Sequence, residues 1–412
     1  MFKRLAFIFL ALGLSALNFA PAAQADFKAA SKNISNTMAD SLYPKIVSLP
    51  GTSYAFVIWI EVSGDEDLLY FSRSTDGGAS WSTPFQLTTA GQIRSHSGIP
   101  DNDYLYDFFN LSIAVQEPNI HIVYQWRLNA SNPFRIVYAR SSDLGATAQN
   151  WTSMTLTSVT SDAIHPDVAV RGEYVHIAYD SNWTGNESIM YKRIAGYGAG
   201  AVDLTRRLSF SSTGAYFPRI AVCAAGDIVS VVYEDNVSGN YNILYKNIGS
   251  SGAGAFGTYQ LTFSASGNDF PDITTSAGTA PEDQYVYIVY ETRSWAVPEM
   301  MYKRLDNYGK PGFSVTTARL TYSYAQSRFG SVEFDDANNI VNISYSDTWP
   351  GNFDVMHKKF SNFGGVGFTS QRVSWGTGDS THPSVAAIDS GAYIAWSDNT
   401  SGNYEILVKK GS

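Results

Sequence analysis

The residues of this sequence that are best suited to chemistry gather in one polar stretch, residues 89–109. Carboxylates together with a histidine can transfer protons, and carboxylate oxygens are ligands that Ca²⁺ prefers. However, Asp101-Asn102-Asp103 is followed by Tyr104 and does not continue as a calcium-binding loop. We therefore predict that the stretch contacts a ligand and needs no cofactor, with Ca²⁺ binding or a solvated polar loop as open alternatives. The candidate ligand-binding residues are Arg94, His96, Asp101, Asp103 and Asp107.

Tryptophans form a second group of candidate binding residues. Four of the nine fall in or at turns that follow β-branched and aromatic runs, and Trp183 and Trp349 stand four residues after Tyr179 and Tyr345, respectively. Exposed rings on one face stack on sugar rings or anchor a partner protein. Packing of the rings inside the fold is the alternative. The candidate ligand-binding tryptophans are Trp126, Trp183, Trp295 and Trp349.

A repeated block shows which elements must position these side chains. It reads His165-Pro166-Asp167-Val168, and similar blocks begin at Phe217 and His382. The apolar residue of the block recurs at spacings of 67, 55, 52, 53, 59 and 53 residues, and such a period is typical of repeat architectures. The first spacing is the longest because it contains residues 89–109. The seven markers are Ile46, Ile113, Val168, Ile220, Ile273, Val332 and Val385.

Each unit is predicted to contain four antiparallel strands and no helix. Short alternating runs are separated by turn residues every 8 to 12 positions, which is typical of all-β folds. Four strands per repeat of about 50 residues form one blade of a β-propeller. We therefore predict a seven-bladed β-propeller with blades starting near residues 43, 110, 165, 217, 270, 329 and 382. Outer strands are expected at 85–88, 205–209, 259–262 and 318–321.

The ring is predicted to close through the N-terminal residues. The last unit ends near Lys410 without a fourth strand of its own. Ile34-Ser35 lies ten residues before Pro44, just as Leu208-Ser209 lies ten residues before Pro218. Residues 32–36 are therefore expected to form the outer strand of the last blade, which removes an exposed sheet edge.

The N-terminus has the pattern of a signal peptide. Lys3 and Arg4 precede a short apolar run, and Ala23-Gln24-Ala25 fits a cleavage site. The run is too short to span a membrane, and no cysteine follows it as a lipid attachment site. We expect residues 1–25 to be removed, leaving one propeller domain over residues 26–412 in the periplasm or outside the cell.

Composition narrows the range of partners. The formal net charge of −9 argues against nucleic acid, which needs a basic surface. The single cysteine, Cys223, excludes a disulfide framework and a cysteine-based metal cluster. A glycan or an extracellular protein remains as the expected partner, and the oligomeric state is left open.

One turn carries a family resemblance. Ser74-Thr75-Asp76-Gly77-Gly78-Ala79-Ser80-Trp81 resembles the Asp-box of the BNR-repeat, sialidase-like propellers, and Ser141-Ser142-Asp143-Leu144-Gly145 is a stretched copy. The resemblance implies a propeller in which the Asp-box is a folding element. Catalytic members use three arginines, a Tyr-Glu pair and an acid-base Asp, and typically carry an Arg-Ile-Pro motif. Here Tyr43-Pro44-Lys45 stands in that region and no Arg-Ile-Pro occurs, so no catalytic residue is carried over.

Other recurring residues are predicted to be structural. His165 and His382 precede the proline of an inner strand and are expected to line the central channel. The aromatic residues of the second strands recur once per blade and are predicted to lie in the core: Trp59, Tyr124, Tyr179, Tyr233, Tyr290, Tyr345 and Trp396.

Three classes of function are compatible with these observations. The favoured one is a non-enzymatic exported propeller that recognises a carbohydrate or a protein through its tryptophan-rich face. The alternatives are a sialidase-like glycoside hydrolase or lyase, and a structural subunit of a surface assembly. A cluster formed by Arg94, Arg219, Arg293 and Arg328 would favour the enzyme.

Overall fold

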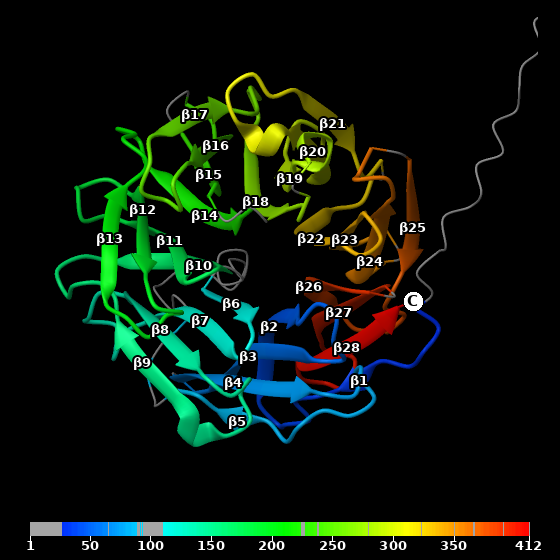
Figure 1. The fold of residues 1–412 in the computed structure, drawn as a ribbon. Helices are drawn as coiled ribbons and strands as arrows, with labels where there is room; N and C mark the ends of the chain where they lie inside the picture. Colours follow the sequence, from blue (N-terminus) through cyan, green and yellow to red (C-terminus); the bar gives the residue numbers. More distant parts are fainter. Residues whose placement is uncertain are drawn as a thin grey trace, which may run out of the picture.

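The computed structural model shows seven four-stranded antiparallel sheets arranged in a ring around a central axis (Figure 1). The predicted fold, a seven-bladed all-β propeller, is confirmed. The structure describes residues 27–411 apart from 65, 89, 90, 92, 94–109, 224–226, 237, 238, 279, 323, 350, 366 and 390. No helix in these residues is long and apolar enough to cross a membrane.

The strands of blades one to four follow each other from the axis outward. Blade one contains β2 (Asp40–Ser48), β3 (Ala55–Ser63), β4 (Glu66–Ser74) and β5 (Phe85–Gln86). Blade two contains β6 (Leu111–Gln116), β7 (Asn119–Trp126), β8 (Arg135–Ser141) and β9 (Trp151–Thr155). Blade three contains β10 (Ala163–Arg171), β11 (Tyr174–Ser181), β12 (Ser188–Ile194) and β13 (Val202–Arg207). Blade four contains β14 (Ala215–Val222), β15 (Val229–Asp235), β16 (Asn242–Ile248) and β17 (Phe256–Gln260).

The remaining blades repeat this order. Blade five contains β18 (Asn268–Thr275), β19 (Tyr285–Thr292), β20 (Glu299–Asp306) and β21 (Val315–Arg319). Blade six contains β22 (Ser327–Asp335), β23 (Ile340–Asp347), β24 (Asp354–Phe360) and β25 (Phe368–Arg372). Blade seven contains β26 (Ser380–Ile388), β27 (Gly391–Asp398), β28 (Glu405–Gly411) and, outermost, β1 (Lys32–Asn33). Three short 3₁₀ turns lie between strands, at Ala148–Asn150, Pro281–Asp283 and Asn307–Gly309.

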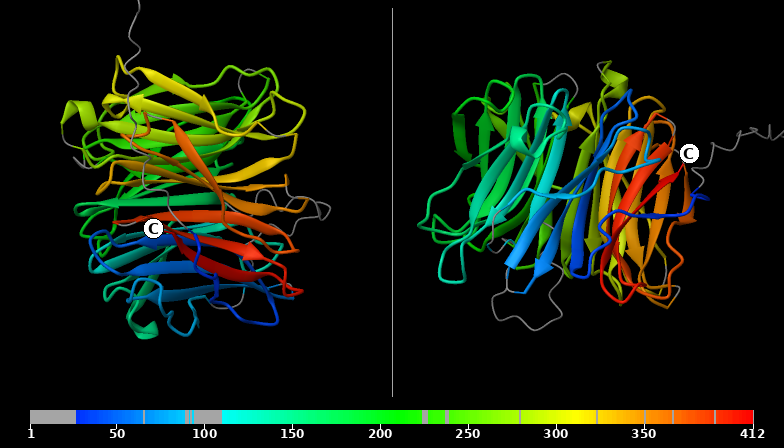
Figure 2. Two further views of the ribbon diagram at one scale, coloured as in Figure 1. Left: turned by 90° about the vertical axis from the view of Figure 1, so that its right-hand side faces the viewer. Right: turned by 90° about the horizontal axis from the view of Figure 1, so that it is seen from below.

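The two ends of the chain meet in blade seven, as the sequence predicted. Lys32 pairs with Val408, and the backbone N–H of Ile34 donates to the carbonyl of Ile406 at 2.9 Å. The hydroxyl of Ser35 donates to the carboxylate of Glu405, which is buried. Figure 2 shows the blue N-terminal segment lying against the red C-terminal strand. The chain therefore closes its own ring by hydrogen bonding.

A hydroxyl latch ends the outer strand of every blade. In each blade, the backbone N–H of an aliphatic residue donates to a carbonyl of the third strand, which is β28 in blade seven. The hydroxyl of the next residue, a serine or a threonine, accepts a backbone N–H from the same third strand. For example, Leu261 donates to Ile243 at 2.8 Å, and the hydroxyl of Thr262 accepts from Ile243 at 2.9 Å. The seven latch hydroxyls belong to Ser35, Thr88, Thr157, Ser209, Thr262, Thr321 and Ser374.

The latch corrects the predicted bounds of the outer strands. They end before the latch pair, at Gln86, Arg207, Gln260 and Arg319, whereas the sequence prediction ran through the pair. The physical reason is that a side-chain hydroxyl replaces the next carbonyl of the ladder, so the backbone turns toward the following blade.

The core lies between the blades. All seven second-strand aromatic residues are buried, which confirms their predicted role. The Asp-box turn is also structural: the Asp76 carboxylate accepts bonds from Ser74 and from the backbone N–H of Ser80, each at 2.9 Å. The hydrogen bonds from Ser80 and Ser74 lower the pKa of Asp76 to about 2.

Candidate functional site

Six inner strands begin with a bulge that brings an aromatic ring or histidine close to the axis. The residue before the proline, or before Gly330 in blade six, has a positive φ of 50–58°, which is uncommon for bulky residues. The strand register shifts at the same point, as expected for a β-bulge. The described inner strand of blade two, β6, shows no such shift. The bulge residues are Tyr43, His165, Phe217, Phe270, Phe329 and His382.

These side chains form contacts from blade to blade around the axis. The rings of Phe329 and His382 are 3.9 Å apart, and those of His165 and Phe217 are 4.3 Å apart. Packing of the rings against each other explains why these side chains are buried. Their burial is therefore no evidence of metal binding or catalysis. We call the face of the disc at which the inner strands begin and the second strands end the entry face.

A side chain of the preceding blade accepts a hydrogen bond from the backbone N–H of five of the six bulge residues. The amide oxygen of Gln125 accepts from His165 at 3.0 Å, and the hydroxyl of Ser397 accepts from Tyr43 at 3.1 Å. Neutral acceptors therefore satisfy this backbone requirement in two blades. In blade one, which precedes the blade without a bulge, the equivalent residue is the apolar Ile60.

Blades three, four and five place carboxylates where neutral groups serve elsewhere. Glu234 accepts from the N–H of Phe270 at 2.5 Å, and Glu291 accepts from Phe329 at 2.8 Å. The N–H of Phe217 hydrogen-bonds to Asp180 in the same way. A buried carboxylate costs far more desolvation energy than an amide or a hydroxyl. The fold alone does not require charge at these positions.

Two arginines of blades five and six pair with buried carboxylates of this face, one of them a further residue, Asp269. The Nε atom of Arg293 lies 2.5 Å from Asp269 Oδ2, and that of Arg328 lies 3.1 Å from Glu291 Oε2. The Arg293 side chain is half exposed, whereas Asp269 and Glu291 are buried. We call Asp180, Glu234, Asp269, Glu291, Arg293 and Arg328 the entry-face cluster.

The carboxyl groups of this cluster have different electrostatic surroundings. Burial, reinforced by the carboxyl of Asp269, raises the pKa of Glu234 well above its usual value. Burial also raises the pKa of Asp269, but Arg293 opposes that shift by its charge and its hydrogen bond. The pKa values of both carboxyl groups are therefore raised, and Arg293 favours the ionised form of Asp269 by charge and hydrogen bond but that of Glu234 by charge alone. Unequal surroundings within a pair of carboxyl groups are typical of acid-base sites.

Two tyrosines and a histidine flank the cluster. The hydroxyl of Tyr216 donates to Glu187 Oε2 at 3.1 Å. Tyr241 is half-buried, and burial and the carboxyl of Glu234 raise its pKa. His165 Nδ1 lies 2.9 Å from Asp180 Oδ2, and burial raises the pKa of Asp180 despite the histidine. The entry face thus brings together several groups that can donate or accept protons.

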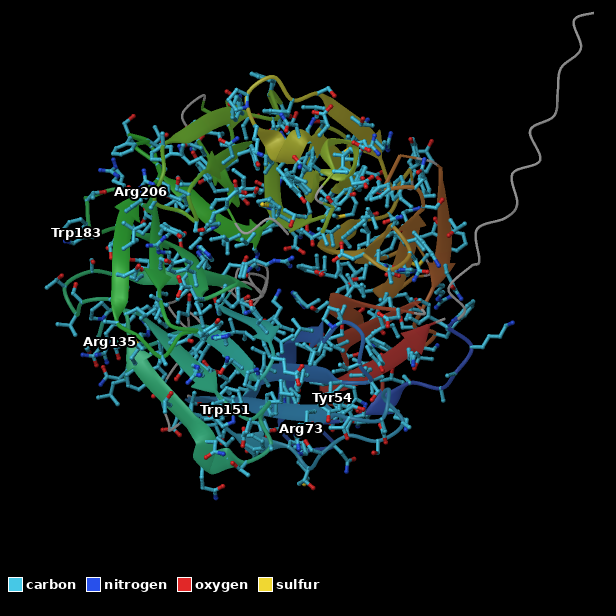
Figure 3. The ribbon with its side chains drawn as sticks, in the orientation of Figure 1. Tyr54, Arg73, Arg135, Trp151, Trp183 and Arg206 are labelled. Carbon is cyan, nitrogen blue, oxygen red and sulfur yellow. The ribbon has the colours of Figure 1, made fainter. Side chains whose placement is uncertain are left out.

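The structure places the predicted binding residues unevenly. Trp183 and Trp349 are 65% and 73% exposed, and Trp183 projects from the rim of blade three (Figure 3). Trp295 is 41% exposed and lies against the guanidinium of Arg319, with 3.9 Å between Arg319 Cζ and the centroid of the Trp295 ring. Trp126 instead packs half-buried against the core of blades one and two. Arg94, His96, Asp101, Asp103 and Asp107 lie outside the described residues.

The predicted arginine cluster is found only in part. Arg293 and Arg328 both neighbour Asp269 on the entry face. Arg219 is elsewhere: it lies in the channel, where its Nη1 is 3.4 Å from Asp167 Oδ1. Arg94 lies outside the described residues.

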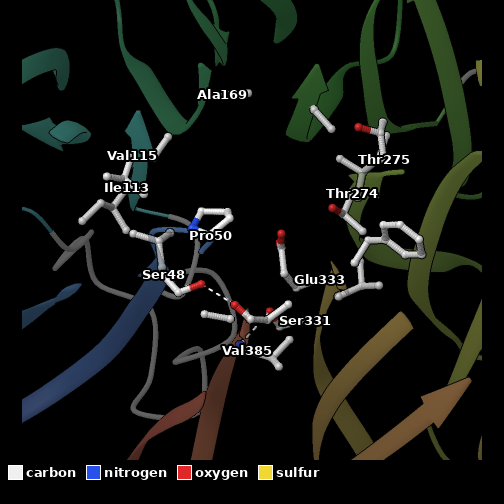
Figure 4. Close-up of a pocket in the computed structure, with 18 of the residues that line it drawn as sticks. Ser48, Pro50, Ile113, Val115, Ala169, Thr274, Thr275, Ser331, Glu333 and Val385 are labelled. Carbon is white, nitrogen blue, oxygen red and sulfur yellow. Dashed lines mark hydrogen bonds between the residues drawn. The ribbon is translucent and has the colours of Figure 1, made fainter. Parts of the chain in front are cut away.

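The channel contains a second polar site, a cavity of about 580 Å³ that extends toward the opposite face. Glu333 points into it among small side chains (Figure 4). Burial, followed by Asp272 and Asp336, raises the pKa of Glu333 to about 8. Lys45 also lines the cavity, and burial together with Arg219 lowers its pKa well below the usual value.

Five polar residues that line this channel connect neighbouring blades. Side chains that follow the bulge position accept an N–H from the next inner strand: Ser112, Asp167, Asp272, Ser331 and Ser384. This repeated bond is a structural role. No group of three potential ligands in the described part of the chain is arranged to hold a metal ion, and the expectation that no cofactor is needed stays a prediction.

Sequence reasoning missed the entry-face carboxylates although a signal was present. Three of the four follow a second-strand tyrosine directly, as Tyr179-Asp180, Tyr233-Glu234 and Tyr290-Glu291. The tyrosine is predicted to lie in the core. Its acidic neighbour points to the other side of the strand, because side chains alternate along a strand, and is not among the predicted site residues.

Comparison with known proteins supports the fold. No family model matches the sequence, and a comparison with curated protein sequences finds no match. Among solved structures, polysaccharide lyase Uly1 is 10% identical, with a TM-score of 0.54 over 96% of this chain and 94% of that one. A leech intramolecular trans-sialidase is 11% identical, with a TM-score of 0.50 over 93% of this chain and 70% of that one.

A Trypanosoma rangeli sialidase is 14% identical, with a TM-score of 0.46 over 73% of this chain. The match spans about half, 53%, of that sialidase. At these identities the comparisons show a shared propeller fold and no more.

Proposed function

We propose that this protein is exported, that it cleaves glycosidic bonds as a hydrolase or lyase, and that the entry-face cluster is its reaction site. The observation that carries the proposal is the use of Asp180, Glu234 and Glu291 at positions where Gln125 and Ser397 meet the same backbone requirement. Buried titratable groups that the fold does not need are typical of active sites. The likeness of the fold to a polysaccharide lyase and a trans-sialidase is compatible with this proposal.

The arrangement suits hydrolysis by two carboxyl groups. Glu234, whose pKa is raised well above its usual value by burial, donates a proton to the glycosidic oxygen as the bond to the anomeric carbon breaks. Asp269, paired with Arg293, accepts a proton from the water that attacks that carbon. Glycosidases divide the acid and base roles between two carboxyl groups in this manner. The exposed Arg293 of the cluster and the half-buried Tyr241 that flanks it are the groups that a substrate meets first.

A lyase would use the same face differently. In β-elimination a base removes a proton beside a carboxylate, and an acid protonates the leaving oxygen. The His165–Asp180 pair and the Tyr216 hydroxyl are groups suited to those two tasks. The two reactions give different products, so one assay can separate them.

A non-enzymatic glycan- or protein-binding propeller is the second candidate. The observation in its favour is the exposure of Trp183 and Trp349, whose rings are free of the packing expected for core residues. Binding without turnover would leave the entry-face carboxylates without a function.

The test is cleavage of a panel of polysaccharides by the purified mature protein and its Glu234→Gln variant. New reducing ends report hydrolysis, and ultraviolet absorbance of an unsaturated uronate reports elimination. The amide should replace the carboxylate as acceptor for Phe270, as Gln125 does for His165, so the melting temperature should hold. Activity should fall by about 10²–10⁴-fold, the usual contribution of a general acid.

Glu299→Gln is the matched control. Glu299 lies on the third strand of blade five and is equally buried. It pairs with Arg319 and lies outside the cluster. Full activity in Glu234→Gln would contradict the assigned role. Binding of a polysaccharide with no cleavage of any member of the panel would favour the binding propeller.

A further inference from the structure

A groove of about 670 Å³ runs between blades five and six. One wall is the segment after β21, with Tyr322 and Tyr324, and the other is blade six, with Trp349 after β23 and Phe368 on β25. Because β23 ends and β22 begins on the entry face, the groove opens beside that face. Its volume lies within the range of small-ligand sites.

The rings that border the groove are held out in solvent. Tyr322 is 68% exposed, and Tyr324 and Trp349 are 103% and 73% exposed. The backbone of Trp349 is fixed, since its N–H donates to Asp347 Oδ1 at 2.7 Å. The ring of Tyr322 lies against Arg319, with 4.6 Å between Arg319 Cζ and the centroid of the Tyr322 ring. Trp349 and Tyr322 are thus anchored, and all three rings are largely open to solvent.

The floor of the groove is polar and electrically balanced. Lys358 is buried there, donates to the hydroxyl of Ser370, and lies 4.1 Å from the centre of the Phe368 ring. Asp347, also in the floor, accepts from Ser327 at 2.8 Å. One cation and one anion face the groove from the same blade, so an occupant needs no net charge.

We propose that this groove binds uncharged pyranose units of a polysaccharide chain. A pyranose has an apolar face that stacks on an aromatic ring and a rim of hydroxyls that hydrogen-bond to polar side chains. The open faces of Tyr322, Tyr324 and Trp349 supply the first, and the tyrosine hydroxyls, Asp347 and Lys358 supply the second. The electrical balance of the floor favours such units over a sulfated or uronate-rich segment.

The role of this site is to hold a polymer near the entry-face cluster, and in that respect it rests on the proposed function. Binding itself is independent of turnover. A chain held between blades five and six would pass close to Arg328, which begins the inner strand of blade six. The groove would then contribute to the affinity for polymers and not to the cleavage of short substrates.

The experiment is affinity electrophoresis of the mature protein in gels that contain xylan, glucomannan, laminarin or, as anionic probes, polygalacturonate or hyaluronan. At least one neutral polysaccharide should retard the protein. A Tyr322→Ala/Trp349→Ala double variant should bind about tenfold or more weakly, because each stacked ring contributes a two- to tenfold factor. Its melting temperature should stay within about 2 °C of the wild type, since exposed rings contribute little packing.

Trp183→Ala is the matched control, because Trp183 has nearly the same exposure and the equivalent position on blade three, outside the groove. Its retardation should equal that of the wild type. Equal weakening by Trp183→Ala, retardation by the anionic probes alone, or no retardation by any probe would overturn the groove assignment. So would a dimer in solution that dissociates in the double variant.

These outcomes are separable from failure of the proposed function. A protein that binds neutral polysaccharide but cleaves nothing retains the groove and loses the enzyme. A protein that cleaves short substrates but shows no retardation retains the enzyme and loses the groove.

Discussion

Replacing Thr262 by valine tests whether the hydroxyl latch stabilises a blade as the geometry indicates. The hydroxyl accepts the N–H of Ile243 at 2.9 Å and donates to Asn242 Oδ1 at 3.1 Å. Valine has nearly the same volume, so no cavity forms. Asn242 Oδ1 keeps a second donor, the N–H of Ser264 at 3.0 Å. The substitution therefore leaves one buried backbone N–H without an acceptor.

The expected cost follows from that single group. An unsatisfied buried donor costs about 1–3 kcal/mol. With an unfolding entropy of roughly 2.1 cal/mol/K per residue, a chain of roughly 385 residues has an entropy near 0.8 kcal/mol/K at its midpoint. The melting temperature should therefore fall by about 1–4 °C.

Calorimetry or scanning fluorimetry measures this fall in melting temperature, and two variants serve as controls. Thr262→Ser keeps the hydroxyl, as Ser209 and Ser374 do in blades three and six, and should lose less stability. Thr258→Val removes an exposed hydroxyl of the same blade that contacts Lys246, and should change the melting temperature by less than about 1 °C. If Thr262→Val melts with the wild type, the latch does not contribute as described.

Two further predictions concern closure of the ring and the channel. Deletion of residues 26–36 removes the pairing of Lys32 with Val408 and the buried Ile34, and should lower the melting temperature by many degrees; unchanged melting of the truncated chain would contradict closure through β1. Glu333→Gln should stabilise the protein at about pH 9 and leave it nearly unchanged at about pH 4. The native pKa of about 8 lies above the ordinary 4.5, so wild-type stability falls as pH rises between those values; equal pH dependence of both proteins would show that Glu333 titrates normally.

The fold was predictable because its signals recur. A block such as His165-Pro166-Asp167-Val168 appears in most units, and its period gives both the number of blades and the completion of blade seven by residues near Ile34. The ends of the outer strands were harder to predict from the sequence, because the latch changes the hydrogen-bond acceptor without changing the apolar pattern. Hydroxyl residues recur at those positions, but their role as acceptors is visible only when the third strand is placed beside them.

The candidate site was hidden because it depends on contacts between blades. A glutamate after a strand tyrosine is compatible with an exposed side chain, and nothing local shows that Glu234 caps the N–H of Phe270 in the next blade. Likewise, the pairing of Arg293 with Asp269 joins residues 24 positions apart, whose proximity follows from the turn of blade five. Tryptophans were easier, since exposure of Trp183 and Trp349 follows from their place in loops.

Comparison between blades shows which side chains serve only as acceptors for a backbone N–H and which also bring a titratable group that the backbone does not need. Every bulge needs an acceptor for its N–H, and Gln125 shows that an amide is sufficient. Where blades three to five use carboxylates, the fold bears a desolvation cost that the neighbouring arginines offset only in part, as the raised pKa values of Glu234 and Glu291 show. A sequence under selection for stability alone would replace these acids by glutamine or serine. Their concentration on adjacent blades, beside an exposed arginine and a half-buried tyrosine, is therefore the reason to look for turnover on this face before attributing the protein to binding alone.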